Sequence, residues 1–179
     1  MLYALDSDFF VWWRRNLKYN LLGTYRLSDK FYNAYPYDKY PEILHKEVRP
    51  YICLLIKTDN GFYICVPFRS HINHKEAFLF KKSKRSQKYC SGIDFKKTII
   101  INDVNYIDLS ELAVVDNDEY KEMFENSAAI MRKSDRYIST YINHISGVKV
   151  LHEREFERRY MYSTLPYFDE LLKTVSDNS

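Results

Sequence analysis

Two apolar runs, Tyr51–Thr58 (YICLLIKT) and Phe62–Phe68 (FYICVPF), flank the turn sequence Asp59-Asn60-Gly61. Asn-Gly is preferred in two-residue type I′ turns, so the stretch predicts a β-hairpin with this pair at its tip. Both arms are apolar on both faces, which is typical of covered strands, and this places the hairpin at the centre of a sheet. Pro67 has no amide hydrogen for a neighbouring strand, so we expect the second arm to leave the sheet near this residue.

Around the hairpin, the pattern predicts short strands and amphipathic helices. We expect an ordered loop held by Tyr and Pro over 20–50, because the periodicity breaks down there. Strands are expected at 2–5, 97–101, 106–109 and 112–115. Helices are expected at 8–18, 118–146 (with Gly147 as its stop), 153–162 and 167–175. This order predicts an α+β fold, helices packed on an antiparallel sheet, in one domain over 1–179.

The composition excludes several classes of protein. Aromatic residues make up 17% of the chain, enough for a sizeable core, while four Gly and five Pro exclude collagen-like and linker-rich chains. No apolar run reaches the roughly 18 residues of a membrane span. The first residues, MLYALDSDFFVWWRR, lack the basic leader and uninterrupted apolar run of a signal peptide. We therefore expect a cytoplasmic protein that does not enter membranes.

Nothing in the sequence points to a metal or a cofactor. The three cysteines, Cys53, Cys65 and Cys90, have no Cys-x-x-Cys spacing and are expected to be thiols rather than zinc ligands. His71 and His74 lack a clear third ligand. Glycine is too rare for a nucleotide-binding loop, and the Gly-x-Ser-x-Gly elbow of hydrolases is absent around Ser70. The prediction is therefore that the protein works without a cofactor.

Positive charge is concentrated in residues 69–97. This stretch has nine basic and two acidic residues, or +7, in a chain of net charge +3. Its densest part, 81–89, has the composition of an exposed loop that binds phosphates, although such a run can also be merely solvated or neutralised by acidic neighbours. The candidate RNA-binding residues are Lys75, Lys81, Lys82, Lys84, Arg85, Lys88 and the possible stacking ring Tyr89, with Arg132, Lys133 and Arg136 of the long helix.

A second candidate site comes from the hairpin geometry. His45 and Arg49 precede the first arm, and Arg69, Ser70 and His71 follow the second. The start of one arm and the end of the other are neighbours in a hairpin, so these residues are expected to meet at one sheet edge. Imidazoles, guanidinium groups and a hydroxyl suit metal-free RNA cleavage through the ribose 2′-OH, which yields a 2′,3′-cyclic phosphate and leaves DNA inert. A single His at a strand end is, however, more often an ordinary surface residue.

The segments Arg49–Ile56 and Asn60–His71 resemble the toxins of type III toxin–antitoxin systems, the ToxN, AbiQ, CptN and TenpN group, with CptN closest in length. Members of this group have a similar hairpin that ends in a Pro-Leu-(Ser/Thr)-Ser-Pro-Lys type motif. Ser70 matches the serine of this motif, whereas Arg69 falls where relatives often have Thr or Ser, and His71 replaces the Pro. The resemblance covers about residues 49–147.

The resemblance implies a twisted antiparallel sheet with surrounding helices, as in the MazF and Kid toxins. It also implies a metal-independent endoribonuclease of phage defence that cuts its repeat antitoxin transcript and cellular RNA. Folded pseudoknot repeats of the antitoxin RNA would inhibit it in a closed protein–RNA assembly. The residues expected to carry protons are His45 and His71, and those expected to stabilise the phosphate are Arg49, Arg69 and Ser70.

Two other classes of function fit the same residues. A non-catalytic RNA-binding or ribosome-associated module would use the same basic loop and exposed tyrosines. A protein–protein adaptor, the weaker alternative, would use the densely charged stretch 153–159.

Overall fold

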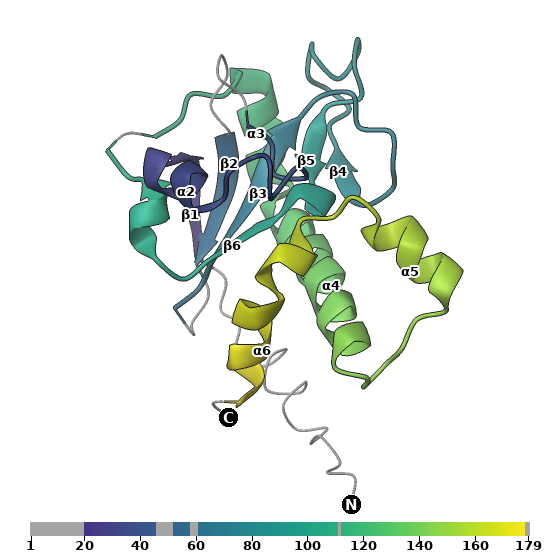
Figure 1. Ribbon diagram of the computed structural model, residues 1–179. Helices are drawn as coiled ribbons and strands as arrows, with labels where there is room; N and C mark the ends of the chain where they lie inside the picture. Colours follow the sequence, from purple (N-terminus) through teal and green to yellow (C-terminus); the bar gives the residue numbers. More distant parts are fainter. Residues whose placement is uncertain (1–19, 46–51, 58–60, 111, 178–179) are drawn as a thin grey trace, which may run out of the picture.

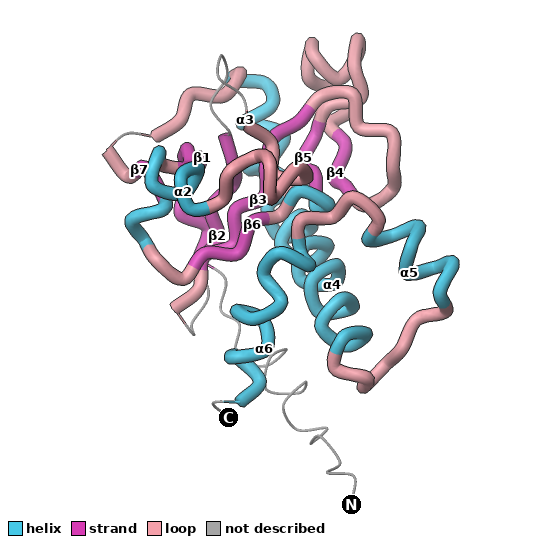
Figure 2. The backbone as a smooth tube through the Cα atoms, viewed as in Figure 1, coloured by secondary structure: helices cyan, strands magenta, loops and turns pink. Residues whose placement is uncertain are grey.

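The structure of this chain is a computed structural model. It describes residues 20–45, 52–57, 61–110 and 112–177 (Figure 1). In this part of the chain, seven strands form one antiparallel sheet in the order β4-β5-β3-β2-β1-β7, and β6 pairs with β3 beside β5. Apart from one short helix between the first two strands, the helices follow the sheet in sequence, and they share its hydrophobic core (Figure 2). The predicted α+β class is therefore confirmed.

The predicted hairpin is present as β2 (Ile52–Lys57) and β3 (Tyr63–Arg69), and it is central in the sheet as expected. Its turn prediction fits less well. Lys57 pairs with Tyr63, whereas a two-residue turn at Asn60-Gly61 would place Lys57 opposite Ile64. Residues 58–60 lie outside the described part, and Gly61 has the positive φ of 85° that glycine tolerates.

Pro67 marks a change of partner rather than the end of β3. On the side away from β2, Tyr63–Cys65 pairs with β6 (Ile99–Ile101), and Phe68–Arg69 pairs with β5 (Gly92–Asp94). Pro67 lies between these two ladders, where its missing amide hydrogen breaks neither of them. β3 continues for two residues past Pro67 and ends at Arg69, so the arm leaves the sheet near the proline, as expected, but not because of it.

The predicted loop over 20–50 begins with regular structure. Asn20–Leu27 forms β1, which pairs with β2 and with β7 (Ile107–Asp108), and Asp29–Ala34 forms the short helix α2. A register shift next to Gly23 interrupts the alternation that identifies a strand in sequence. Aromatic contacts do hold the following turns, since Tyr35 stacks on Phe31 at 4.8 Å and meets Tyr40 at 5.0 Å. The predicted strand at 2–5 and helix at 8–18 lie outside the described residues.

The strands predicted after the basic segment are partly confirmed. β6 and β7 lie within the first two predicted ranges, separated by the 3-10 turn η2 (Val104–Tyr106). Residues 112–115 form no strand, and only Ala113 bonds to β1, through both backbone and side chain of Thr24. Besides β1, two strands were not predicted from the sequence, β4 (Ala77–Leu79) and β5, and each has only three residues.

The long predicted helix is two helices, α3 (Asn117–Glu125) and α4 (Ser127–Ile145). They meet at Asn126, whose side-chain amide donates to the carbonyl of Glu122 at 2.7 Å. Gly147 follows α4 with a φ of 76°, as expected of a helix stop. The later helices are α5 (Glu153–Tyr160) and α6 (Asp169–Asp177), the latter after the 3-10 turn η3 (Leu165–Phe168).

One hydrophobic core joins the hairpin to α4. Figure 1 shows α4 running behind the sheet, and its buried face, which includes Tyr137 and Tyr141, belongs to the same cluster as Leu54 and Ile64 of the hairpin. Among the described residues, no helix combines the length and apolarity that a membrane span requires. The hairpin is thus a rigid support for the residues that follow β3.

We predict that Gly92→Ala destabilises the protein by roughly 3 kcal/mol, because the added Cβ would lie 2.0 Å from the carbonyl oxygen of Phe78 in the neighbouring strand. Backbone atoms cannot move away as a side chain can. The control is Gly61→Ala, where no atom lies within 4 Å and only the positive φ costs about 1 kcal/mol. Urea unfolding measures both, and equal losses would contradict the close packing of β4 on β5.

Candidate functional site

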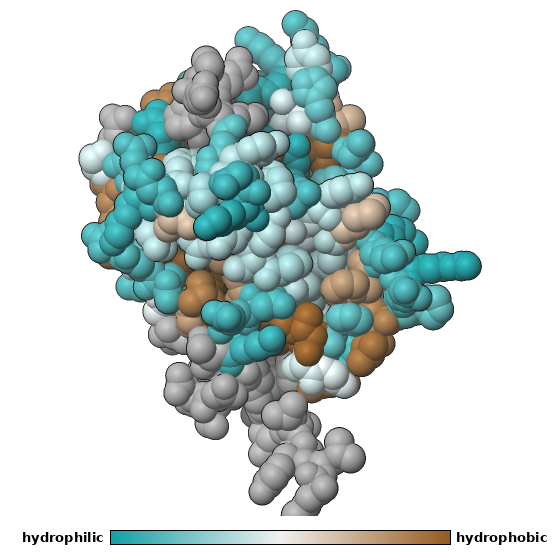
Figure 3. Space-filling model, in the orientation of Figure 1, coloured by the Kyte–Doolittle hydropathy of each residue, from teal (hydrophilic) through white to brown (hydrophobic). Residues whose placement is uncertain are grey.

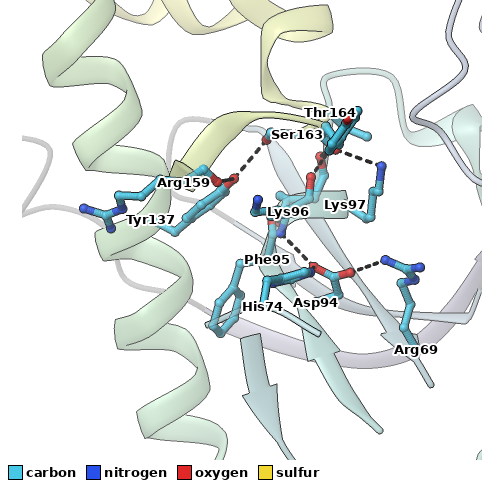
Figure 4. A network of polar contacts seen from close by, with 12 residues as sticks. Arg69, His74, Asp94, Phe95, Lys96, Lys97, Tyr137, Arg159, Ser163 and Thr164 are labelled. Atoms are coloured by element: carbon cyan, nitrogen blue, oxygen red, sulfur yellow. Dashed lines mark hydrogen bonds and ion pairs between the residues drawn. The ribbon is translucent and has the colours of Figure 1, made fainter. Parts of the chain in front are cut away.

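A buried carboxylate lies at the end of β3. The side chain of Asp94, in β5, is fully buried and accepts a hydrogen bond of 2.5 Å from Arg69 Nη1. Its second oxygen accepts from the backbone N–H of Lys96 at 2.9 Å and lies 3.3 Å from His74 Nε2. Figure 4 shows the guanidinium and the imidazole approaching the carboxylate from opposite sides.

The charge on Asp94 is stabilised by these partners. Burial by itself raises the pKa of Asp94, but the hydrogen bond and charge of His74 and the charge of Arg69 outweigh it and hold this pKa below its usual value. Asp94 is therefore an ionised anchor at neutral pH rather than a proton donor. It fixes Arg69 against the sheet, and only a quarter of that side chain is exposed.

The next two residues of the chain form a separate exposed group. His71 has a φ of 60°, unusual for a residue other than glycine, and its Nδ1 lies 3.2 Å from Ser70 Oγ. The imidazole packs on the ring of Tyr89, with 4.7 Å between ring centroids. A backbone hydrogen bond of 2.9 Å from Ile72 N to Cys90 O joins the segment after β3 to the segment that carries Tyr89. We call Ser70, His71 and Tyr89 the strand-end group.

The structure does not bring all the predicted catalytic residues together. His45 lies against α2, where its Nε2 is 2.9 Å from the carbonyl oxygen of Tyr35 and its ring contacts that of Tyr32. Its described contacts include none with Arg69 or with the strand-end group. Arg49 lies outside the described residues. Ser70 and His71 are thus adjacent as expected, whereas Arg69 is bound to Asp94 and His45 to α2.

Acidic residues of α3 hold the backbone of the basic loop. Glu122 accepts hydrogen bonds from the consecutive amides of Lys81 (2.7 Å) and Lys82 (2.9 Å). Asp118 accepts from the amide of Lys84 at 2.8 Å, and this bond holds the pKa of Asp118 below its usual value. The sequence-based interpretation that acidic neighbours neutralise the loop is thus confirmed in part.

Arg85 of the basic loop forms ion pairs with carboxylates of the same chain. Its guanidinium pairs with Asp116 at 2.6 Å and with Glu119 at 3.8 Å. Glu119 is buried and accepts a bond of 2.8 Å from Ser91, and burial raises the pKa of its carboxyl. Lys82 lies 3.6 Å from Glu125, an exposed pair of little strength.

The loop has four exposed lysines, and three of them have no acidic partner among the described residues. Among the described residues, no carboxylate forms an ion pair with Lys81, Lys84 or Lys88. Figure 3 shows hydrophilic side chains gathered over this loop, at the upper right. Tyr89, at the end of the loop, is 47% exposed and connects it to the strand-end group.

Of the other candidate RNA-binding residues, one lies next to the strand that leads into the loop. Lys133 of α4 lies 5.4 Å from the ring centre of Phe78 in β4, the strand that leads into the loop. Arg132 and Arg136, on the same helix, are exposed, as is Lys75. The exposed positive charge therefore extends from the loop toward α4.

Two further lysines of the basic segment serve the fold. Lys96 Nζ donates to the carbonyl oxygens of Arg158 and Met161, at 3.1 and 3.2 Å, and burial lowers its pKa. Lys97 donates to the carbonyl of Tyr162 at 2.8 Å and pairs with Glu42. The formal charge of +7 for residues 69–97 therefore overestimates the positive charge that is exposed to a ligand.

No site for a metal ion is found in the described part of the chain, where no three His, Cys, Asp or Glu side chains cluster as ligands. The groups available for chemistry are an imidazole, a hydroxyl and a phenol beside exposed ammonium groups. These groups suit proton transfer and phosphate binding. Asp94 and the role of α3 were missed in the sequence, although Asp94 is one of only two acidic residues within the basic segment.

Comparison with protein-family models, with curated proteins and with solved structures found no match to this chain.

We predict that Asp94→Asn destabilises the protein by about 3 kcal/mol at pH 7, because Arg69 and His74 lose their buried counter-charge. The pKa of Asp94 is lowered by folding, so its contribution is complete above the ordinary value of 3.8 and is lost as the pH falls through the lowered value. The difference between wild type and variant should therefore shrink below pH 3.8. Urea unfolding at pH 7 and pH 3 measures it, and a difference independent of pH would contradict this role.

Proposed function

We propose that this protein is a metal-independent endoribonuclease. The observation that carries the proposal is the strand-end group. An exposed imidazole bonded to a hydroxyl lies at the end of a central strand, and Tyr89 links it to a loop with four exposed lysines. RNA supplies both phosphates for the lysines and a 2′-OH as the internal nucleophile.

The Ser70–His71 contact suits the first step of this reaction. In the tautomer with hydrogen on Nδ1, the imidazole donates to Ser70 Oγ, which leaves the Nε2 lone pair to accept the 2′-OH proton. The 2′ oxygen then attacks the phosphorus, and the bond from phosphorus to the 5′ oxygen breaks. The Ser70 hydroxyl hydrogen is left to donate to a phosphoryl oxygen as charge develops there. The products are a 2′,3′-cyclic phosphate and a 5′-hydroxyl.

The leaving 5′ oxygen needs a proton from a second group. Tyr89 is the favoured donor, because its ring packs directly on His71. His45, the other candidate from the sequence, is engaged with Tyr35 of the α2 region in the described contacts. Arg69 is proposed to support the site through its remaining guanidinium donors rather than through the donor that binds Asp94.

The biological setting is proposed from the resemblance to type III toxins. In that setting the enzyme cuts its repeat antitoxin transcript and cellular RNA in the cytoplasm, and pseudoknot repeats of the antitoxin RNA block it in a closed assembly. The antiparallel sheet with helices is compatible with the proposed MazF/Kid-like fold. The exposed lysines support RNA, rather than protein, as the partner.

A non-catalytic RNA-binding module is the second candidate function. The observation that favours it is the position of His45, which removes one of the two expected proton carriers from the vicinity of His71. Such a module would bind RNA through the loop and leave it intact. The two candidates therefore differ in whether RNA is cut in the presence of EDTA.

We predict that the purified protein cleaves single-stranded RNA in EDTA and that His71→Ala lowers the single-turnover rate by about 10²- to 10⁴-fold, the usual contribution of a general base. Ser70→Ala and Tyr89→Phe should also slow cleavage, whereas His45→Ala should leave the rate within about twofold. RNA affinity should change little in His71→Ala. Intact RNA after incubation with wild type would support the binding module instead.

We also predict that one 2′-deoxy nucleotide at the cleavage position blocks cutting without weakening binding, because it removes the nucleophile and keeps the phosphates. Gel analysis of 5′-labelled RNA, followed by phosphatase treatment of the product, distinguishes a 2′,3′-cyclic end from a simple monophosphate. Cleavage of the deoxy-substituted RNA at that position would contradict attack by the 2′-OH.

A further inference from the structure

The carboxylates of α3 meet the basic loop in an unusual way. Glu122, which is 5% exposed, points both of its oxygens at backbone amides, those of Lys81 and Lys82, and not at lysine ammonium groups. Asp118 binds the amide of Lys84 in the same manner. Three N–H groups of the loop are therefore occupied from within the protein, and these three do not face a ligand.

The loop is also braced from inside. Ser83 is fully buried, and its hydroxyl accepts from the amide of Ser86 at 3.0 Å while lying 3.5 Å from Glu119. Backbone bonds from Gln87 to Ser83 (3.2 Å) and from Tyr89 to Arg85 (2.8 Å) close helix-like turns. Each of these bonds restricts the backbone in a stretch that would otherwise be free to move.

These turns arrange the exposed lysines. Residues four apart in a helix-like turn lie on one side, so Lys84 and Lys88 project together, while Arg85 faces Asp116 on α3. Tyr89 follows at the end of the loop, against His71. The loop thus carries exposed ammonium groups and, at its end, one exposed aromatic ring, a combination that suits an RNA backbone and a stacked base.

We propose that the acidic edge of α3 holds the basic loop in its RNA-binding conformation, and that Glu122 and Asp118 are positioning residues for RNA. This inference rests on the proposed function for the identity of the ligand. The carboxylates do not touch RNA. They fix the loop before binding, so that its lysines lose little conformational freedom when they engage phosphates.

When a carboxylate of α3 is removed, the proposal and simple electrostatics predict opposite changes in RNA affinity. Removing a carboxylate next to a basic surface makes the surface more positive, and charge alone would strengthen RNA binding. Loss of a positioning residue loosens the loop and weakens binding instead. The direction of the change thus separates the two roles.

The test compares Glu122→Gln with Glu125→Gln, a matched change on the same helix. Glu125 is exposed and pairs only with lysine side chains, Lys82 and Lys121. Both variants are made in the full chain carrying His71→Ala, so that the RNA stays intact. The affinity for a labelled single-stranded RNA is measured over a salt series, together with hydrogen exchange of the amides of residues 81, 82 and 84.

We expect Glu122→Gln to weaken RNA binding roughly tenfold and to reduce the salt slope by about one phosphate contact. The NH2 group of Gln cannot accept from a backbone N–H, so one of the two bonds is lost and the other is no longer charge-assisted. The three amides should exchange faster. Glu125→Gln should bind RNA as tightly as its parent or about twofold tighter. Binding by Glu122→Gln that is unchanged or stronger would overturn the proposal.

A second variant decides the matter if Glu122→Gln does not fold, as judged by its thermal melt. Asp118→Asn changes a less buried partner of the loop and should weaken RNA binding in the same direction. Failure of this inference is distinct from failure of the proposed function. If the parent binds and wild type cuts RNA while both loop variants bind normally, only the inference fails, whereas a parent that does not bind RNA contradicts both.

Discussion

Strand β3 pairs with three other strands, and the position of the residues at its end depends on this pairing. One of its edges binds β2 throughout, and the other binds β6 before Pro67 and β5 after it. The change of partner brings Asp94 close to Arg69, because β5 runs beside the last two residues of β3. A strand with one continuous partner on that side would place neither the buried carboxylate nor the segment that carries Tyr89 at this end of the sheet.

The parts of the fold that could be predicted from sequence are those with a local cause. The hairpin has two apolar arms of full strand length, and Gly147 ends a periodic helical pattern. β4 and β5 have three residues each, too few for any periodicity to appear, and they are held by long-range pairing, β5 with β3 and β4 with β5. The break at Asn126 is equally invisible, since a single residue barely disturbs the spacing of apolar residues.

In the candidate site, too, the features with a local cause could be predicted and those that depend on distant residues could not. Ser70 and His71 could be identified because they directly follow an apolar strand, and position after a strand is a local property. The meeting of His45 with His71 was inferred from hairpin register alone, but His45 belongs to the turns after α2, whose aromatic contacts set its place. The bond between Glu122 and the loop spans about forty residues, and no spacing rule relates a helix face to loop amides at that distance.

A basic loop can lie beside an acidic helix and still bind phosphates, because the carboxylates and the ammonium groups bind different partners. The carboxylates of Glu122 and Asp118 bind backbone N–H groups, which would otherwise need water or another acceptor as the loop leaves the sheet. Lys84 and Lys88 are on flexible stems whose ammonium groups stay in solvent. The carboxylates reduce the attraction of these lysines for a phosphate, but water and salt strongly screen this effect of the carboxylates. The ordering of the loop backbone is not weakened by screening. The loop therefore gives up some long-range attraction and gains a fixed shape, which favours a ligand recognised at close range.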